Sequence, residues 1–250
     1  MAEAGLQVFN DKNTLTVDST YQNLGLRSKV TLYTTIVRHG ANRYDVSEVN
    51  VTYPLGQMVA AYVDPQYFVT MGHLYTINGG MVTQNYWVSK KSFVGGIHLD
   101  VGSSAPAGTP VEFFMFGEPV HTGNFGLQVF NQQGVLVFSS ASGYMKVVAH
   151  WQSPVQNTAG MAGDFAYDAT NQPKLAYVFS RHPWRDNLTW FKGDPWAYLE
   201  YSTNGVCMDA GMIHSRTWTW FSYMYQTNFD VPYNVNLLEH SILVLDVKGL

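Results

Sequence analysis

Between His182 and Tyr225 the chain alternates large aromatic residues with polar ones, a combination typical of binding surfaces. Three tryptophans recur every six residues in RHPWRDNLTWFKGDPW, and two more tryptophans and two tyrosines crowd the following TWTWFSYMY. Indole and phenol rings can stack on the faces of sugars while neighbouring polar groups bond their hydroxyls, and they can equally anchor a protein interface. The candidate binding residues are Trp184, Arg185, Asp186, Trp190, Trp196, Trp218, Trp220, Tyr223 and Tyr225.

The same aromatic pattern also has a structural interpretation. Trp218 and Trp220 are two residues apart and would share one face of a strand. Rings placed in this way commonly pack in a core or between sheets. Core packing, a protein interface and a glycan or receptor site therefore remain three open interpretations of this region.

Catalytic and metal-binding signatures are weak. Glu112 with Glu118, or Asp186 with Glu200, are the pairs to consider as the two carboxylates of a glycosidase, but their spacing carries no specificity. The chain contains no H-E-x-x-H, G-x-S-x-G or Walker sequence. No histidine lies two or four residues from another histidine or from Cys207. We therefore expect no enzymatic activity, no metal and no cofactor.

Composition narrows the classes of partner. The net charge is −4, and no run of Lys or Arg is longer than Lys90–Lys91. Without a basic patch we expect neither nucleic acid nor an anionic membrane as a partner. No apolar run approaches the roughly 18 residues of a membrane span, and the N-terminus does not resemble an export signal. The lone Cys207 excludes an intrachain disulfide scaffold, so we expect synthesis in a cytoplasm without export.

The elements that must position these residues read as short strands. Aromatic residues make up 15% of the chain and charged residues only 13%, with 22 Gly to form turns, which favours an all-β fold. No segment predicts a long helix. Besides the repeated region described next, the expected strands are 57–63, 67–71, 82–88, 111–116, 175–180, 197–201, 217–225 and 241–247.

The hexapeptide GLQVFN occurs twice, at Gly5 to Asn10 and at Gly126 to Asn131. Both copies continue with turn chemistry and a second β-rich run, so each predicts a hairpin. Gly134 is expected to adopt the left-handed conformation of the turn, and its counterpart is Asn13, which tolerates positive φ best after glycine. Another alternating strand follows each hairpin, over Val30 to Ile36 and over Met145 to Trp151.

The duplication predicts two β-sandwich-like domains, each opening with the same hairpin. The boundary is expected within 117–124, where Gly, Pro and Thr-Gly-Asn connect one strand to the second GLQVFN. The predicted domains are residues 1–122 and residues 123–250, the second carrying the aromatic region.

The segment GLQVFNQQGVLVFSSASGYMKVV resembles a family of virion proteins encoded in the tail modules of tailed bacteriophages. The resemblance covers this segment and its counterpart after Gly5. Members commonly have an Asp in the second strand of the hairpin. Asp18 matches it, whereas Ser139 replaces it in the second copy, so a role for that carboxylate does not extend to both halves. The motif therefore indicates a scaffold that members share and not a reaction that they share.

The resemblance implies a structural component of a phage tail tip or baseplate, located in the virion. Its partners would be other tail and baseplate proteins, and it would form a homo-oligomer, a trimer or a multiple of three. The first domain would dock to the tail, and the second would face outward toward a host glycan or protein receptor. Low charge with abundant Tyr, Trp and Asn suits large permanent interfaces.

Three other functions stay open at this point. One is a purely architectural tail protein, and the second is a non-catalytic glycan-binding module. The third, a host-glycan hydrolase, is the least favoured, because no catalytic signature accompanies its carboxylates.

Overall fold

A computed structural model of the chain describes residues 7–9, 15–18, 23–39, 44–90, 93–94, 98–99, 104–120, 126–152, 163–166, 174–180, 184–190, 196–209, 212–226, 234–236 and 241–250. Every regular element within these ranges is a strand, which confirms the all-β prediction. Within these same ranges, no helix has the length and apolar character needed to cross a membrane.

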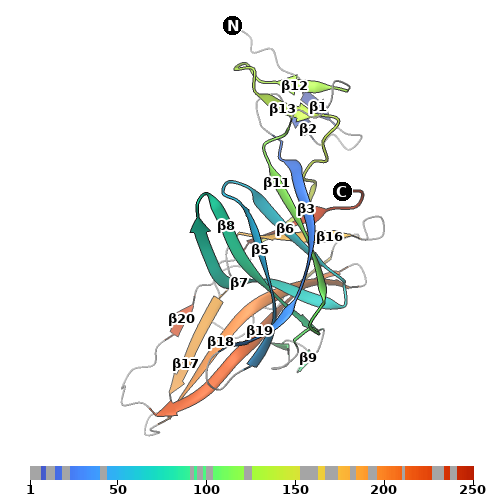
Figure 1. Cartoon of the computed structure of the whole chain (residues 1–250). Coiled ribbons are helices and arrows are strands. Elements are labelled where there is room, and N and C mark those ends of the chain that lie inside the picture. Colours follow the sequence, from blue (N-terminus) through green and yellow to red (C-terminus); the bar gives the residue numbers. More distant parts are fainter. Residues whose placement is uncertain are drawn as a thin grey trace.

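Two large sheets form the body of the protein (Figure 1). The larger sheet has the order β4 (Thr35–His39), β5 (Tyr44–Pro54), β8 (Met81–Lys90), β7 (Tyr67–Asn78), β18 (Trp196–Asp209), β19 (Met212–Gln226), β10 (His98–Leu99) and β9 (Phe93–Val94). Three strands lie off this path: β15 (Gly163–Ala166) pairs with β19, β17 (Trp184–Trp190) with β18, and β20 (Asn234–Asn236) with β17. The smaller sheet has the order β14 (Val147–Gln152), β21 (Ser241–Asp246), β16 (Leu175–Phe179), β6 (Met58–Val63), β11 (Pro110–Gly117) and β3 (Gly25–Tyr33).

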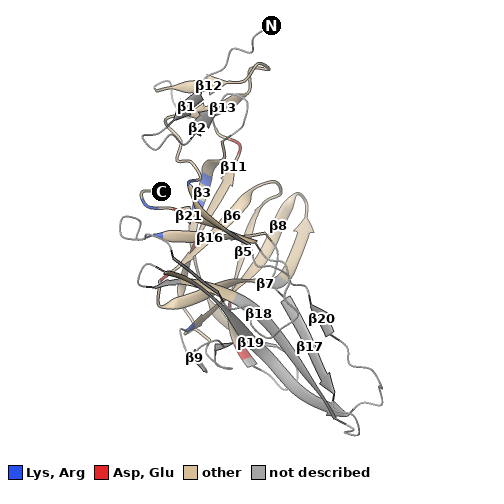
Figure 2. Ribbon diagram, turned by 180° about the vertical axis from the view of Figure 1, so that it is seen from behind, with Lys and Arg blue, Asp and Glu red and all other residues tan. Residues whose placement is uncertain are grey.

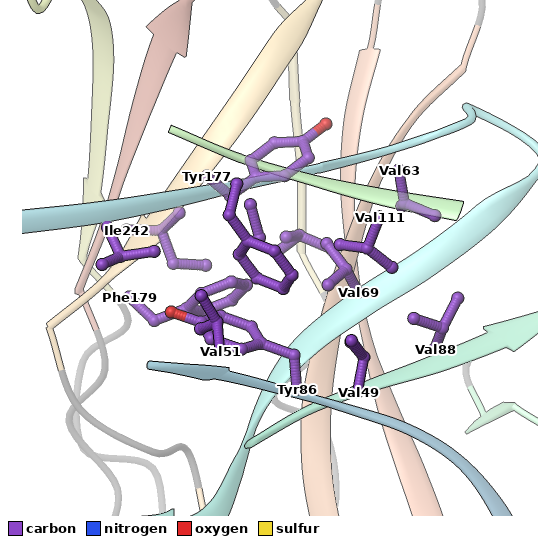
Figure 3. Packing of buried hydrophobic residues seen from close by; sticks show 14 of the residues in the cluster. Val49, Val51, Val63, Val69, Tyr86, Val88, Val111, Tyr177, Phe179 and Ile242 are labelled. Carbon is purple, nitrogen blue, oxygen red and sulfur yellow. The ribbon is translucent and has the colours of Figure 1, made fainter. Parts of the chain in front are cut away.

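The main core lies between these two sheets. Alternate residues of these strands point inward, so valines of β5, β7 and β8 meet aromatic residues of β11 and β16 in the part of the core that the structure describes. Tyr86 packs on Phe113 with ring centroids 5.0 Å apart and on Phe179 at 6.3 Å. Figure 3 shows Val49 and Val51 on one side of this core and Tyr177 on the other. The tight interior holds the two sheets together.

Each large sheet combines strands from both halves of the sequence. In the smaller sheet, β3, β6 and β11 of the first half lie beside β14, β16 and β21 of the second. In the larger sheet, β7 meets β18 where Val69 pairs with Val206. Neither sheet is therefore divided at residue 122. The assignment of separate docking and outward-facing roles to residues 1–122 and 123–250 stays a prediction.

Two expected strands differ from the structure for identifiable reasons. The run from Val30 to Ile36 breaks at Thr34, whose N–H donates to the carbonyl of Thr109. There the chain leaves β3 in the smaller sheet and enters β4 in the larger. The single face predicted for Met145 to Trp151 is interrupted by a bulge between Val147 and Ala149, which leaves Val147 exposed and packs Val148 and Ala149 on the core.

The outer face of the smaller sheet carries a network of charges. The Glu112 carboxylate accepts hydrogen bonds from Lys174 Nζ at 2.7 and 2.9 Å and forms an ion pair with Lys29 Nζ at 3.0 Å. Both ammonium groups also lie over the Phe114 ring. Burial alone would raise the pKa of Glu112, but the hydrogen bonds and charges of Lys174 and Lys29 together lower it. These long side chains help to cover the buried ring of Phe114.

Candidate functional site

The two GLQVFN segments form hairpins with the same register. β1 (Gln7–Phe9) pairs with β2 (Leu15–Asp18), and β12 (Gln128–Phe130) pairs with β13 (Leu136–Ser139). Gln7 lies opposite Asp18 as Gln128 lies opposite Ser139, and each hairpin has a bulge after its first valine. The sequence repeat is thus a structural repeat. We call these two hairpins together the hairpin pair.

Three residues of the second hexapeptide are required by the hairpin itself. Gly126 has φ +108°, and a Cβ there would collide with Ser140 Oγ. Val129 is buried in a small cluster with Val137. Asn131 Oδ1 accepts hydrogen bonds from the N–H groups of Gln133 and Val135, which closes the turn.

The turn prediction is confirmed in the second hairpin, since Gly134 has φ +75°. Its counterpart in the first hairpin, Asn13, lies outside the described residues.

Other residues of the hexapeptide have no comparable internal role. Leu127 is 50% exposed and Phe130 is 46% exposed, yet the first copy has the same residue types at Leu6 and Phe9. Val135, at the other side of the turn from Phe130, is 47% exposed. Leu127, Phe130 and Val135 are thus three exposed apolar residues on one small hairpin, and exposed apolar residues that gather on a surface commonly mark an interaction site.

The segments after the two hairpins pair with each other. Met145 N donates to Leu24 O at 3.0 Å, and Gly25 forms a bridge with Tyr144. Leu24 and Met145 are equivalent positions in the two copies, so the repeat continues into a nearly symmetric junction. Asn23 N also donates to Val137 O, which ties the second hairpin to the start of β3. This junction holds the hairpin pair at one end of the body (Figures 1 and 2).

The predicted aromatic residues lie on three paired strands, β17, β18 and β19, which we call the aromatic ribbon. Figure 1 shows it at the opposite end of the molecule from the hairpin pair. Thr203 of β18 pairs with both Trp184 and Trp218, and Ala197 pairs with both Trp190 and Tyr225.

Directly paired residues share one face of a sheet, so these four positions and that of Tyr223, which pairs with Leu199, lie on one face. Asp186, two residues along from Trp184, belongs to the same face.

The other predicted ribbon residues occupy different positions. Arg185 pairs with Ser202 and Trp196 pairs with Gln226, both on the opposite face by alternation. Trp220 lies where the register shifts between Tyr201 and Ser202. The side chains of the nine predicted residues lie outside the described part of the structure, so their role in binding stays a prediction.

The carboxylates considered as a glycosidase pair occupy different surroundings in the structure. Glu112 is engaged by two lysines. Asp186 pairs with Tyr201 and Glu200 with Asn187, so Asp186 and Glu200 hold positions on opposite faces of the β17–β18 pair. Within the described ranges, no three His, Cys, Asp or Glu side chains gather as metal ligands would.

Sequence reasoning missed a buried carboxylate on β5. Glu48 is only 4% exposed, and its Oε2 accepts hydrogen bonds from Trp87 Nε1 at 3.0 Å and Asn85 Nδ2 at 3.1 Å. Its Oε1 accepts from Asn50 Nδ2 at 3.3 Å. A single Glu in an alternating strand is usually predicted to face solvent. The sequence feature that could have indicated a buried acceptor is the pair of donors Asn85 and Trp87, two residues apart on β8.

The chain matches no protein-family model, no curated protein and no solved structure.

Proposed function

We propose that this protein is a structural component of a phage tail tip or baseplate that docks through the hairpin pair and presents the aromatic ribbon outward. The location follows from the resemblance of the hairpin segment to phage tail proteins. The observation that carries the docking role is the exposure of Leu127 and Phe130, residue types that both copies keep.

The hairpin fold requires some residues of the hexapeptide and not others. Gly126 is required by the close approach to Ser140, Val129 by the small core, and Asn131 by the turn. The hairpin fold does not require the exposed Leu127 and Phe130. Exposed apolar residues are favourable where a partner covers them, and large permanent interfaces are built from such residues.

The shape of the molecule supports the outward role of the aromatic ribbon. The ribbon and the hairpin pair lie at opposite ends, so one end can be attached while the other stays accessible (Figure 1). One face of the ribbon carries the positions of Trp184, Trp190, Trp218, Tyr223 and Tyr225. Aromatic rows with intervening polar positions suit a host glycan or protein receptor. The low charge suits a homo-oligomer within the tail.

The docking role predicts a specific assembly defect. Serine at Leu6, Phe9, Leu127 and Phe130 should lower incorporation into tails at least about tenfold, since each buried anchor of an interface contributes about 2 kcal/mol or more. The measurement is the amount of protein in purified tails by quantitative immunoblotting. The matched control carries Leu55→Ser and Leu74→Ser, which are 57% and 46% exposed on the body. Normal incorporation of the hairpin variant, with an unchanged melting temperature, would contradict docking through the hairpins.

The outward role predicts binding to host cells. Fluorescently labelled protein should bind susceptible cells saturably and should not bind a receptor-deficient strain. Combining Trp190→Ala with Tyr225→Ala should raise Kd about tenfold or more, because both positions lie on one face of the ribbon. The exposed Tyr33, changed to Ala, is the control. Equal binding to both strains by folded, oligomeric protein would contradict the receptor-binding role and support a purely architectural one.

A further inference from the structure

The smaller sheet opens between two of its neighbouring strands. β16 pairs with β6 at a single position, Tyr177 opposite Ala61. On its other edge β6 is paired with β11 from Met58 to Val63, and β16 is paired with β21 along its whole length. The facing edges of β6 and β16 therefore lack ladder pairing beyond Tyr177, toward Met58 and Phe179.

A cavity of about 440 Å³ lies at this opening. Its lining includes Met58 and Val59 from β6, Phe179 from β16, and Tyr53, Met71 and Tyr86 from the larger sheet. The lining also reaches the exposed Ser180, so the cavity communicates with the surface. The described lining contains no Lys, Arg, Asp, Glu or His. Such a site excludes charged ligands, because nothing in it would offset their loss of hydration.

The polar groups of the lining do not call for a polar ligand. Gln57 belongs to the lining, but its Oε1 is buried and out of reach of a ligand in the open cavity. The rings of Tyr53, Tyr86 and Phe179 therefore remain the main surfaces that a ligand would contact.

We propose that this cavity binds a neutral, mainly apolar small molecule. A cavity of roughly 150 Å³ lined by apolar side chains holds a single benzene, and drug-sized ligands occupy pockets of roughly 300–1,000 Å³. The present cavity therefore suits a ligand of two or three rings, or an aliphatic chain of similar bulk. The proposal does not depend on the role of the protein in a tail.

Titration of the full chain with N-phenyl-1-naphthylamine tests the site, because this dye is neutral, has three rings and fluoresces in apolar surroundings. We expect saturable enhancement of its fluorescence. Leu243→Trp and Ser241→Trp each place a large ring on the lining and should each raise Kd at least about tenfold. Leu55→Trp, on the exposed surface, should leave Kd unchanged. Absence of saturable binding, or binding that survives both blocking variants when they are folded, would overturn the proposal by assigning the dye to exposed apolar surface.

Discussion

Replacing Glu48 with leucine is expected to lower the free energy of unfolding by about 3–5 kcal/mol. The carboxylate is buried in the larger sheet and accepts hydrogen bonds from Trp87 Nε1, Asn85 Nδ2 and Asn50 Nδ2. Leucine has a similar volume and offers no acceptor, so the buried indole N–H and the amide of Asn85 lose their partner. Leaving a buried donor unpaired destabilises more strongly than the net gain from one hydrogen bond.

Urea unfolding measures this effect, with equal m-values as the sign that the same two states are compared. Glu48→Gln keeps one carbonyl acceptor and loses the charge, so it should cost less than Glu48→Leu. Glu118→Leu changes an exposed residue and should stay within about 0.5 kcal/mol of the unmodified protein. If Glu48→Leu unfolded at the same urea concentration as the unmodified protein, the network around Glu48 would have no net stabilising role.

The position of Glu48 explains why so large an effect is expected. Its partner Asn85 also accepts a hydrogen bond from Leu74 N at 2.9 Å, within the bulge of β7 between Met71 and Tyr75. Gly72 lies so close to the Asn85 side chain that a Cβ would overlap it. The carboxylate thus orients the amide that holds the bulge. From Leu74 onward the large apolar residues of β7, namely Leu74, Tyr75 and Ile77, are exposed, so the network lies where β7 leaves the core.

Local chemistry made the strands and the hairpins predictable. The positive φ of Gly134 follows from the turn sequence, and buried strands such as Leu175–Phe179 follow from continuous apolar runs. Strand ends were less predictable. β18 extends to Asp209, well beyond the expected 197–201, because its pairing with β19 continues through Thr203 and Cys207. Polar residues can belong to a strand because of ladder pairing alone, and their sequence then lacks the apolar pattern from which strands are predicted.

Long-range pairing could not be read from the sequence. Alternation shows which residues face a core, but it does not identify the neighbouring strand, so nothing in β6 predicts that β16 lies beside it. The segment after Val30 read as one strand because the bonds between Thr34 and Thr109 join residues far apart in the chain. The cavity at Gln57 is equally invisible, since it exists because β6 and β16 pair at one position only.

Cutting the chain at the predicted domain boundary should abolish folding of both parts. A fragment of residues 1–122 would contain β3, β6 and β11 without β14, β16 and β21, and Tyr86 would lose its contact with Phe179. Removing a whole strand from a shared core eliminates many buried contacts, and stability margins of roughly 5–15 kcal/mol cannot absorb this loss. We expect neither fragment alone to show a cooperative thermal transition by circular dichroism.

Refolding the two fragments together distinguishes interleaved sheets from simple damage to the chain. Mixed fragments should regain a cooperative transition and the near-ultraviolet signal of packed aromatic rings, because the strands that they supply to each other complete both sheets. Independent domains would behave in the opposite way, with each fragment melting cooperatively on its own and no change on mixing. The second result would support the predicted division into residues 1–122 and 123–250. The first would make the hairpin pair, to which each half contributes one hairpin, the unit to test for attachment to the tail.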